Sequence, residues 1–512
     1  GFRVGGCGGG GGGVGVVGAE CAGVEAARHR PAAPRPGRGR AGLQVPGREP
    51  RRDQASPRRH RRRRAGRRFP RPGAHGAAAY AQMDPTPRTH VLVLVRSTAD
   101  PVRGRREHGE PGAPGAHRAV PQEHREPAHR PPARQGVVFA DGDEWKRHRK
   151  VVHPAFNMDK LKVMTATMSD CAGSIMSEWK AKVGEGGGAA EIELSGQFEE
   201  LTADVISHTA FGASYREGKR VFLAQRELLF LAFSTVFNVQ IRAFRYLPTQ
   251  KNLKIWKLDK EVRGMLTNII KSRLADKDTM GYGNDLLGLM LEACTPEEHG
   301  HEPLLSMDEI IDECKTFFFA GHDTSSHMLS WTMLLLSTHP EWEQKLREEV
   351  VRECGNEVPT GDVLNKLKLV NMFLLETLRL YSPLSTIQRK AGLDLEVGGI
   401  TVPKGTVLTI PIASIHRDKE VWGEDAHEFN PLRFENGVTR AANHPNAFLS
   451  FSGGPRSCIG QNFAMIEAKI VIVMILQRFS FFLSPKYVHA PMDVITLRPK
   501  FGLPMVLKSL EM

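Results

Sequence analysis

The chain has 512 residues and a formal net charge of +13, and it is long enough for one large domain with a substantial core. The charge is uneven, because residues 1–136 hold 27 arginines, no lysine and 10 acidic residues, whereas the remainder holds 43 basic and 47 acidic residues. The seven cysteines lack paired spacing and any CxxC motif, which argues against a disulfide framework, a zinc cluster and covalently attached c-type haem, and favours a reducing compartment.

Residues 1–136 are rich in Arg, Gly, Pro and Ala and show no sustained helical or strand periodicity. This composition predicts disorder, because it buries too little apolar surface to offset chain entropy. The absence of lysine beside so many arginines favours a second reading, a stretch translated in the wrong frame or from a faulty gene model. The arginine blocks also suit nucleic acid or anionic lipid. A GxGxxG at 13–18 follows a glycine run rather than a strand, so it is poor evidence for nucleotide binding.

Ordered structure is expected from residue 137 onward. Trp145 and Arg149 are spaced i, i+4, so they share one face of a predicted helix, and a surface cation–π pair is one reading of them. Residues 159–300 predict successive amphipathic helices, interrupted by a glycine loop at 184–188. The phenylalanine-rich segment 222–244 fits either core packing or a substrate-access surface.

A long helix is predicted from residue 306 to about residue 338. Ser306 and Glu309 form a capping box at its start, and Pro340 follows its end. Inside it, the run 320–326 (AGHDTSS) places small and polar residues where they reduce helix propensity. A local kink, with Thr324 bonded to the carbonyl of the preceding turn, is one explanation.

A helix at 369–381 carries Glu376 and Arg379 on one face, at spacing i, i+3. On a surface this pair would contribute only about 0.3–0.5 kcal/mol. If the pair is buried, removal of one partner costs ~3–5 kcal/mol.

The segment 451–461 (FSGGPRSCIGQ) places Cys458 between glycines and before an apolar helical run. Gly454 and Gly460 allow the backbone to fold closely around the sulfur, and N–H groups with the following helix N-terminus favour a thiolate. Arg456 is a fixed cation, and Phe451 packs beside the loop. The arrangement suits a thiolate ligand of haem iron, and a buried structural cysteine is the alternative.

These motifs resemble those of the cytochrome P450 monooxygenases, and the resemblance extends from about Val137 to the end of the chain. The segments 451–469 and 487–491 are similar to a plant clan that includes secologanin synthase, cytokinin hydroxylase, brassinosteroid-inactivating hydroxylases and fatty-acid hydroxylases. The resemblance implies a mainly α fold with small β-sheets (α+β), in which the long helix lies over the haem. It divides the chain into a low-complexity segment 1–136 and a monooxygenase domain 137–512. Relatives begin with a membrane anchor and the first strands and helices, and the domain is expected to lack this N-terminal part.

The resemblance also implies the roles of individual residues. Cys458 is expected to be the axial thiolate ligand of haem b. Within the long helix, Gly321 is expected to give room for dioxygen, Thr324 to hydrogen-bond it and Asp323 to relay protons. The expected haem contacts are Trp145, Arg149, Arg389, Arg456, Phe451, Gly454 and Gly460. The expected buried network is Glu376, Arg379 and Arg433.

The function implied is hydroxylation of a lipophilic small molecule, of fatty-acid, terpenoid or hormone type, with O2. NADPH–cytochrome P450 reductase would supply electrons, since the sequence shows no flavin or nicotinamide domain. The endoplasmic reticulum membrane is the location implied, although no run approaches the ~18 apolar residues of a membrane span. No nucleic-acid partner is implied. Two alternatives remain open, a catalytically dead relative from a defective gene model and an arginine-rich nucleic-acid-binding protein acting through residues 1–136.

Overall fold

The computed structural model describes residues 90–92, 136–212, 224–228, 231, 247–283, 285–294, 304–397 and 400–510. Every described residue belongs to the unit formed by residues 69–512. The GxGxxG motif and most of the phenylalanine-rich segment 222–244 lie outside the described residues. The predicted boundary at residues 136 and 137 stays a prediction.

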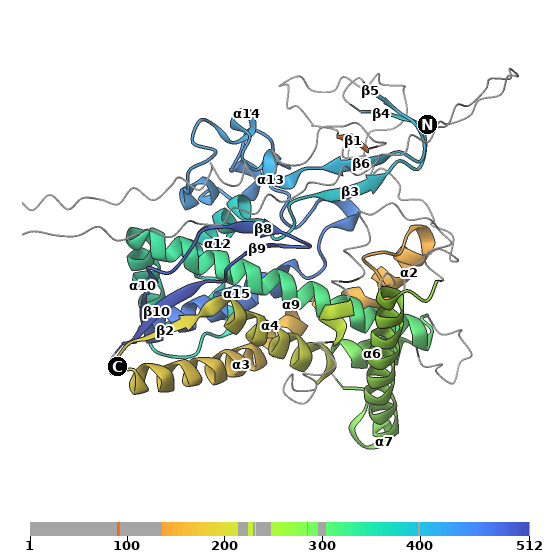
Figure 1. Cartoon of the computed structure of the whole chain (residues 1–512), viewed down its shortest axis with the longest axis horizontal. Helices are drawn as coiled ribbons and strands as arrows, with labels where there is room; N and C mark the ends of the chain where they lie inside the picture. The colour runs from red at the N-terminus through yellow and green to blue at the C-terminus, as the bar shows by residue number, and fades with distance from the viewer. Residues whose placement is uncertain are drawn as a thin grey trace, which may run out of the picture. The chain divides into compact units, whose positions relative to one another are not determined.

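The described part is mainly helical with small β-sheets, which confirms the predicted fold class (Figure 1). The longer helices are α2 (Gly142–Val152), α3 (Met158–Glu185), α4 (Leu194–Phe211), α6 (Gln250–Ala275), α8 (Leu286–Cys294), α9 (Met307–Thr338), α10 (Pro340–Cys354), α12 (Lys368–Leu380) and α15 (Gln461–Arg478). The single-turn helices are α7 (Lys277–Met280), α11 (Gly361–Leu364), α13 (Ile412–Ile415) and α14 (Lys419–Trp422).

In the described residues, four small sheets accompany the helices. The first has the order β1 (His90–Leu92), β6 (Val407–Ile410), β3 (Ile387–Lys390), with β1 parallel and β3 antiparallel to β6. The second is antiparallel, in the order β2 (Ala190–Glu193), β10 (Pro504–Ser509), β7 (Phe479–Leu483). The others pair β4 (Leu395–Val397) with β5 (Ile400–Val402) and β8 (Pro491–Asp493) with β9 (Leu497–Pro499).

Two of these strands lie in segments for which the sequence indicated no strand. Sequence analysis gave residues 1–136 no strand and read 159–300 as helices, yet β1 and β2 are strands of three and four residues. Strands this short contain too few residues to show a period of two. Their pairing with β6 and β10, which lie far along the chain, defines them.

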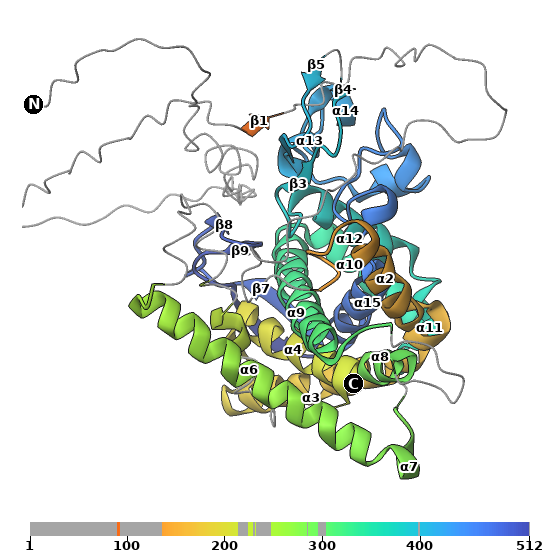
Figure 2. The same ribbon diagram turned by 90° about the vertical axis from the view of Figure 1, so that its right-hand side faces the viewer.

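Helix α9 lies at the centre of the described packing, as Figures 1 and 2 show, with α4 on one side and α12 and α15 on another. Its predicted capping box is confirmed, because the Glu309 N–H donates to Ser306 Oγ at 3.3 Å and the Ser306 N–H donates to Glu309 Oε2 at 2.7 Å. Near its C-terminal end, Trp331 stacks on Tyr381 with ring centroids 4.4 Å apart. The helix that carries the AGHDTSS run is therefore buried along most of its length.

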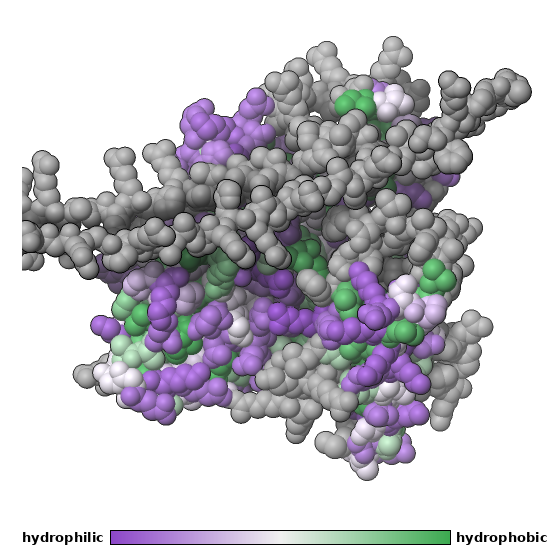
Figure 3. All heavy atoms as spheres, in the orientation of Figure 1, coloured by the Kyte–Doolittle hydropathy of each residue, from purple (hydrophilic) through white to green (hydrophobic). Residues whose placement is uncertain are grey.

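Apolar side chains of α3, α4, α9, α12 and α15 form one continuous core. The face in Figure 3 shows hydrophilic side chains over much of the described surface, with smaller hydrophobic areas between them. Among the described helices, none is both long enough and apolar enough to cross a bilayer.

Candidate active site

Cys458 lies in a short loop whose backbone is held by hydrogen bonds between its own residues. Its N–H donates to the Phe451 carbonyl at 2.8 Å, and the Ser457 N–H donates to the Gly454 carbonyl at 3.0 Å. Gly454 has a φ of +71°, which only glycine adopts without strain, and it starts a 3-10 turn. The loop thus fixes the backbone on both sides of Cys458, and that residue is exposed.

The sulfur of Cys458 lies among protein atoms although part of the residue is exposed. Burial raises the pKa of the thiol, and the Gly460 N–H and the charge of Arg149 only partly oppose this shift. The donors of the loop therefore act in the expected direction, toward the thiolate, and desolvation of the anion, which the sequence did not show, acts more strongly against it. A Cβ at position 460 would lie 4.0 Å from the sulfur, an ordinary contact distance.

Three arginines from different elements gather near this loop. Arg149 on α2 donates to the Ser457 carbonyl at 3.1 Å, and Arg389 on β3 donates to Ser452 Oγ at 3.0 Å. Ser452 was missed by sequence analysis, although its φ of +59° is rare for a residue with a side chain and marks local backbone strain. The partners of Arg149 and Arg389 in these contacts are neutral.

Arg456, the third arginine, belongs to the loop itself. Its guanidinium lies 4.4 Å from the centroid of the Trp145 ring, donates to the Ala140 carbonyl at 2.8 Å and is 3.4 Å from Asp141 Oδ1. A surface cation–π pair between Trp145 and Arg149 was the alternative reading of the sequence, and the cation over the ring is Arg456 instead. The i, i+4 spacing within one helix does not indicate the pair of Trp145 and Arg456, because these two residues belong to distant segments of the chain.

The three guanidinium groups carry more positive charge than their neighbours balance. The pKa of Arg456 is lowered to about 10, because burial together with the charges of Arg389 and Arg149 outweighs the opposing charge of Asp141. Burial also lowers the pKa of Arg389 and of Arg149. A group with two carboxylates beside the Cys458 sulfur would relieve this repulsion, so the residues present fit the propionates and the iron of a haem.

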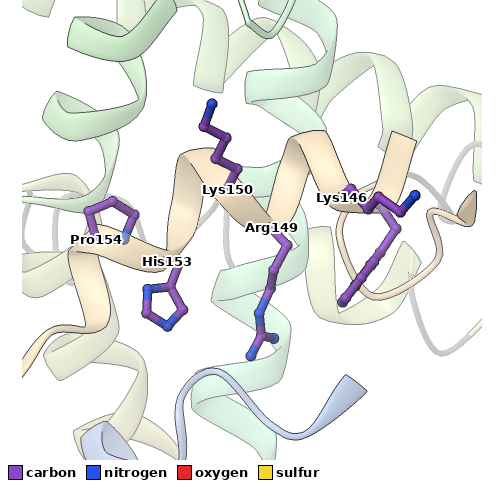
Figure 4. A pocket seen from close by; sticks show the side chains of 6 residues that line it. Lys146, Arg149, Lys150, His153 and Pro154 are labelled. Carbon is purple, nitrogen blue, oxygen red and sulfur yellow. The ribbon is translucent and has the colours of Figure 1, made fainter. Parts of the chain in front are cut away.

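A shallow hollow of about 370 Å³ lies over this part of α2 and the turn after it. It is lined by Trp145, Lys146, Arg149, Lys150, His153 and Pro154. Figure 4 shows Arg149 and Lys150 pointing to opposite sides of α2. Only one of these two adjacent cations therefore reaches toward the Cys458 loop.

The AGHDTSS run is helical, and the hydroxyl groups of Thr324 and Ser326 donate to carbonyls of the same helix. Thr324 Oγ1 donates to the Ala320 carbonyl at 2.6 Å, which is the local arrangement that the sequence allowed. A Cβ added to Gly321 would lie 2.9 Å from Cδ1 of Ile206 on α4. The glycine therefore provides space for a side chain of α4, a packing reason that the sequence did not reveal.

Asp323 is buried and accepts a hydrogen bond from Thr496 Oγ1 at 2.6 Å. Thr496 lies in the turn between β8 and β9, and its hydroxyl is also 2.9 Å from His327 Nδ1. Sequence analysis missed both Thr496 and His327. No local pattern signals the contact, because 173 positions separate Asp323 from Thr496.

Glu376 and Arg379 meet on α12, and both side chains are fully buried. The structure brings Arg433 to the pair, with its Nε 3.5 Å from Glu376 Oε1. Arg433 also forms an ion pair with Asp425 at 2.6 Å, which sequence analysis missed. The three residues named from the sequence therefore lie together, with a fourth at the edge.

The mainly helical fold and the cysteine with its surrounding arginines are those of a haem-dependent oxidoreductase. The family model of Cytochrome P450 matches residues 116–504. Among similar proteins, "Cytochrome P450 709B3" of Arabidopsis thaliana is 51% identical over 378 residues, 73% of each chain. "Cytochrome P450 CYP72A219" of Panax ginseng is 45% identical over 380 residues, 73% of each chain. "Cytochrome P450 734A6" of Oryza sativa subsp. japonica is 43% identical over 385 residues, 73% of this chain and 71% of that one.

The chain belongs to the cytochrome P450 family, and it is a monooxygenase of the oxidoreductase class. Members of this family bind haem through a cysteine thiolate and use O2, an organic substrate and a redox partner. The relatives named above are all plant proteins.

Proposed function

We propose that this protein hydroxylates a lipophilic small molecule of fatty-acid, terpenoid or hormone type. In this proposal O2 supplies the inserted oxygen atom, and NADPH–cytochrome P450 reductase supplies electrons at the endoplasmic reticulum membrane. The observation that carries it is the gathering of Arg149, Arg389 and Arg456 around the loop of Cys458. The substrate class and the location rest on the resemblance to the plant clan.

In this proposal haem b binds with the Cys458 sulfur as axial ligand. The guanidinium groups of Arg149, Arg389 and Arg456 would pair with its two propionates. In the structure their hydrogen bonds go to neutral carbonyl or hydroxyl groups, apart from the contact of Arg456 with Asp141 at 3.4 Å. The bound haem would supply the binding and reduction of O2. Phe451 and Gly454 contribute backbone positions that hold the cysteine loop in shape.

In this proposal two residues of α9, Asp323 and Thr324, take part in the activation of O2. Asp323 relays protons through its carboxylate, and the Thr324 hydroxyl, already donating to the Ala320 carbonyl, keeps its oxygen available as an acceptor. Burial of Asp323 keeps bulk water away from this acid. Proton movement therefore depends on protein groups rather than on free exchange with solvent.

The test is the difference spectrum of the reduced protein with and without carbon monoxide. A haem with thiolate ligation gives a red-shifted band, and Cys458→Ser is expected to abolish it. Cys354→Ser serves as the control, because that half-buried cysteine is the last residue of α10 and not part of the loop, and the band should remain. If Cys458→Ser retains the band and oxygen insertion, the proposed ligand is wrong. If folded wild-type protein loads haem without this band, the proposed function is wrong.

A further inference from the structure

His327 is a fully buried histidine on α9 that none of the sequence motifs explains. Its Nδ1 is 2.9 Å from Thr496 Oγ1, whose hydroxyl is 2.6 Å from Asp323 Oδ2. On the other side of the ring, Nε2 is buried and has no hydrogen-bond partner among the residues that the structure describes. A buried imidazole nitrogen without a hydrogen-bond partner needs an explanation, because an unpaired buried polar atom is energetically unfavourable.

The chemistry of the three groups determines where the protons lie. The Thr496 hydroxyl donates its hydrogen bond to Asp323 Oδ2. The Thr496 oxygen then accepts from His327, which places the ring proton on Nδ1. Nε2 of His327 is consequently a lone pair, and it is the nitrogen that lacks a partner. In both hydrogen bonds, from His327 to Thr496 and from Thr496 to Asp323, the donor therefore lies on the side away from Asp323.

The outer side of the ring faces an acid that reaches the surface. Glu199 Oε1 on α4 is 3.8 Å from His327 Nε2. Glu199 pairs with Arg226 at 2.7 Å, and the Arg226 side chain is 42% exposed while that of Glu199 is 19% exposed. The gap of 3.8 Å exceeds a hydrogen bond, and both carboxylate oxygens of Glu199 contact Arg226, so direct transfer to His327 requires a small rotation of Glu199.

The charges around His327 keep its ring neutral. Burial lowers its pKa, Asp323 on α9 opposes that effect, and Arg498 on β9 and Arg226 add to it. Burial likewise raises the pKa of Glu199, so this carboxylate takes up a proton more readily than an exposed one. A neutral ring can accept a proton at one nitrogen and release one from the other.

We propose that Glu199, His327 and Thr496 form the route by which protons from solvent reach Asp323. A proton held on Glu199 passes to His327 Nε2, the Nδ1 proton passes to the Thr496 oxygen, and the Thr496 hydroxyl proton passes to Asp323. Glu199 loses one proton, Asp323 gains one, the two groups between keep their number, and no electron moves. The route rests on the proposed role of Asp323 in oxygen activation.

The test uses the full-length haem-loaded enzyme with its reductase, NADPH and dodecanoic acid as probe. Glu199→Gln cannot take up a proton, and Thr496→Val removes the connecting hydroxyl. His327→Asn keeps an N–H near the position of Nδ1 but cannot pass a proton through a ring. Each variant is expected to slow oxygen consumption about tenfold or more and to raise its solvent isotope effect, because proton delivery becomes limiting.

The midpoint of thermal unfolding, measured beside the rate, distinguishes residues that transfer protons from residues that only stabilise the fold. Thr496→Val should lower the midpoint of thermal unfolding, since it leaves Asp323 and His327 without their partner, and Thr496→Ser should recover most of that loss and of the lost rate. His327→Asn should retain the unfolding midpoint yet still slow oxygen consumption. Glu200→Gln, an exposed neighbour on α4, is the matched control and should change neither quantity.

The outcomes distinguish the two proposals. If Glu199→Gln and His327→Asn consume oxygen at the wild-type rate with an unchanged solvent isotope effect, the route is wrong while the monooxygenase function stands. Absence of the thiolate band with carbon monoxide in the wild type would instead overturn the proposed function. An equal loss in Glu200→Gln would also overturn the route, because the effect would not be specific to the groups on it.

Discussion

The guanidinium of Arg379 donates two hydrogen bonds to the carboxylate of Glu376, from Nε at 2.7 Å and from Nη2 at 2.8 Å, with both side chains fully buried. Its remaining N–H groups donate to the carbonyls of His416, Ala426 and Glu428 at 2.6–2.9 Å. All five donors of Arg379 are therefore satisfied. The pair ties α12 to the segment 416–428, which precedes the Cys458 loop.

Glu376→Ala is expected to prevent the protein from holding haem. It would leave the buried charge of Arg379 without its counter-ion, a loss of ~3–5 kcal/mol. Unfolding by denaturant and haem content per protein measure the effect. Glu353→Ala removes an ion pair at the surface, with Arg352, and should change stability by at most about 1 kcal/mol. Normal haem loading of Glu376→Ala would show that the pair contributes little.

Arg149→Ala is expected to weaken haem retention. A hydrogen bond from a charged group contributes about 1.5–3 kcal/mol, so transfer of haem to an acceptor protein should become roughly tenfold faster or more. Lys150→Ala is the control, because Lys150 is the adjacent cation on the opposite side of α2. Equal rates of haem loss in the two variants would contradict a specific role for Arg149.

Gly321→Ala is expected to destabilise the protein by about 1–3 kcal/mol through its contact with Ile206. Removal of the clashing Cδ1 by Ile206→Val should recover part of that loss in the double variant, although Ile206→Val alone costs about 0.5–1.5 kcal/mol. Denaturant unfolding of the two single variants and the double variant measures this coupling. Strictly additive losses would mean that the two residues do not clash.

Stability is expected to fall as the pH rises above about 6.5, in part because of His148 on α2. Its Nδ1 is 2.5 Å from Glu313 Oε1 and its Nε2 is 3.3 Å from Glu309 Oε1, both on α9, and the ring is 1% exposed. Burial lowers the pKa of His148, but these two carboxylates outweigh burial, so the pKa is raised. The pKa of Glu309 is lowered to about 2, so this partner stays charged throughout the pH range.

The sign of this dependence follows from the direction of the shift. A raised pKa contributes stability in full below the unfolded value, and this contribution is lost as the pH rises through the folded value. Unfolding midpoints of the wild type between pH 6 and pH 9 should therefore decrease more steeply than those of His148→Gln. His153→Gln, at an exposed position just after α2, should keep the wild-type slope. Parallel slopes for all three proteins would refute the assignment to His148.

The sequence by itself determined the features that depend on neighbours in the chain. The capping box of Ser306 and Glu309, the span of α9 and the turn at Gly454 involve residues a few positions apart, where propensity and hydrogen bonding are local. The pattern around Cys458 likewise lies within ten residues, so the order of residues in that segment is enough to indicate the family. The mainly helical class followed from the same local signals.

The tertiary structure alone decided which distant groups meet. It placed Arg456 rather than Arg149 over the ring of Trp145, and it joined Asp323 to Thr496 across 173 positions. It also showed that burial outweighs the loop donors at the thiol of Cys458. Contacts between distant segments and the desolvation of a charged group depend on how the whole chain packs, and neither quantity is encoded in the spacing of residues within one segment.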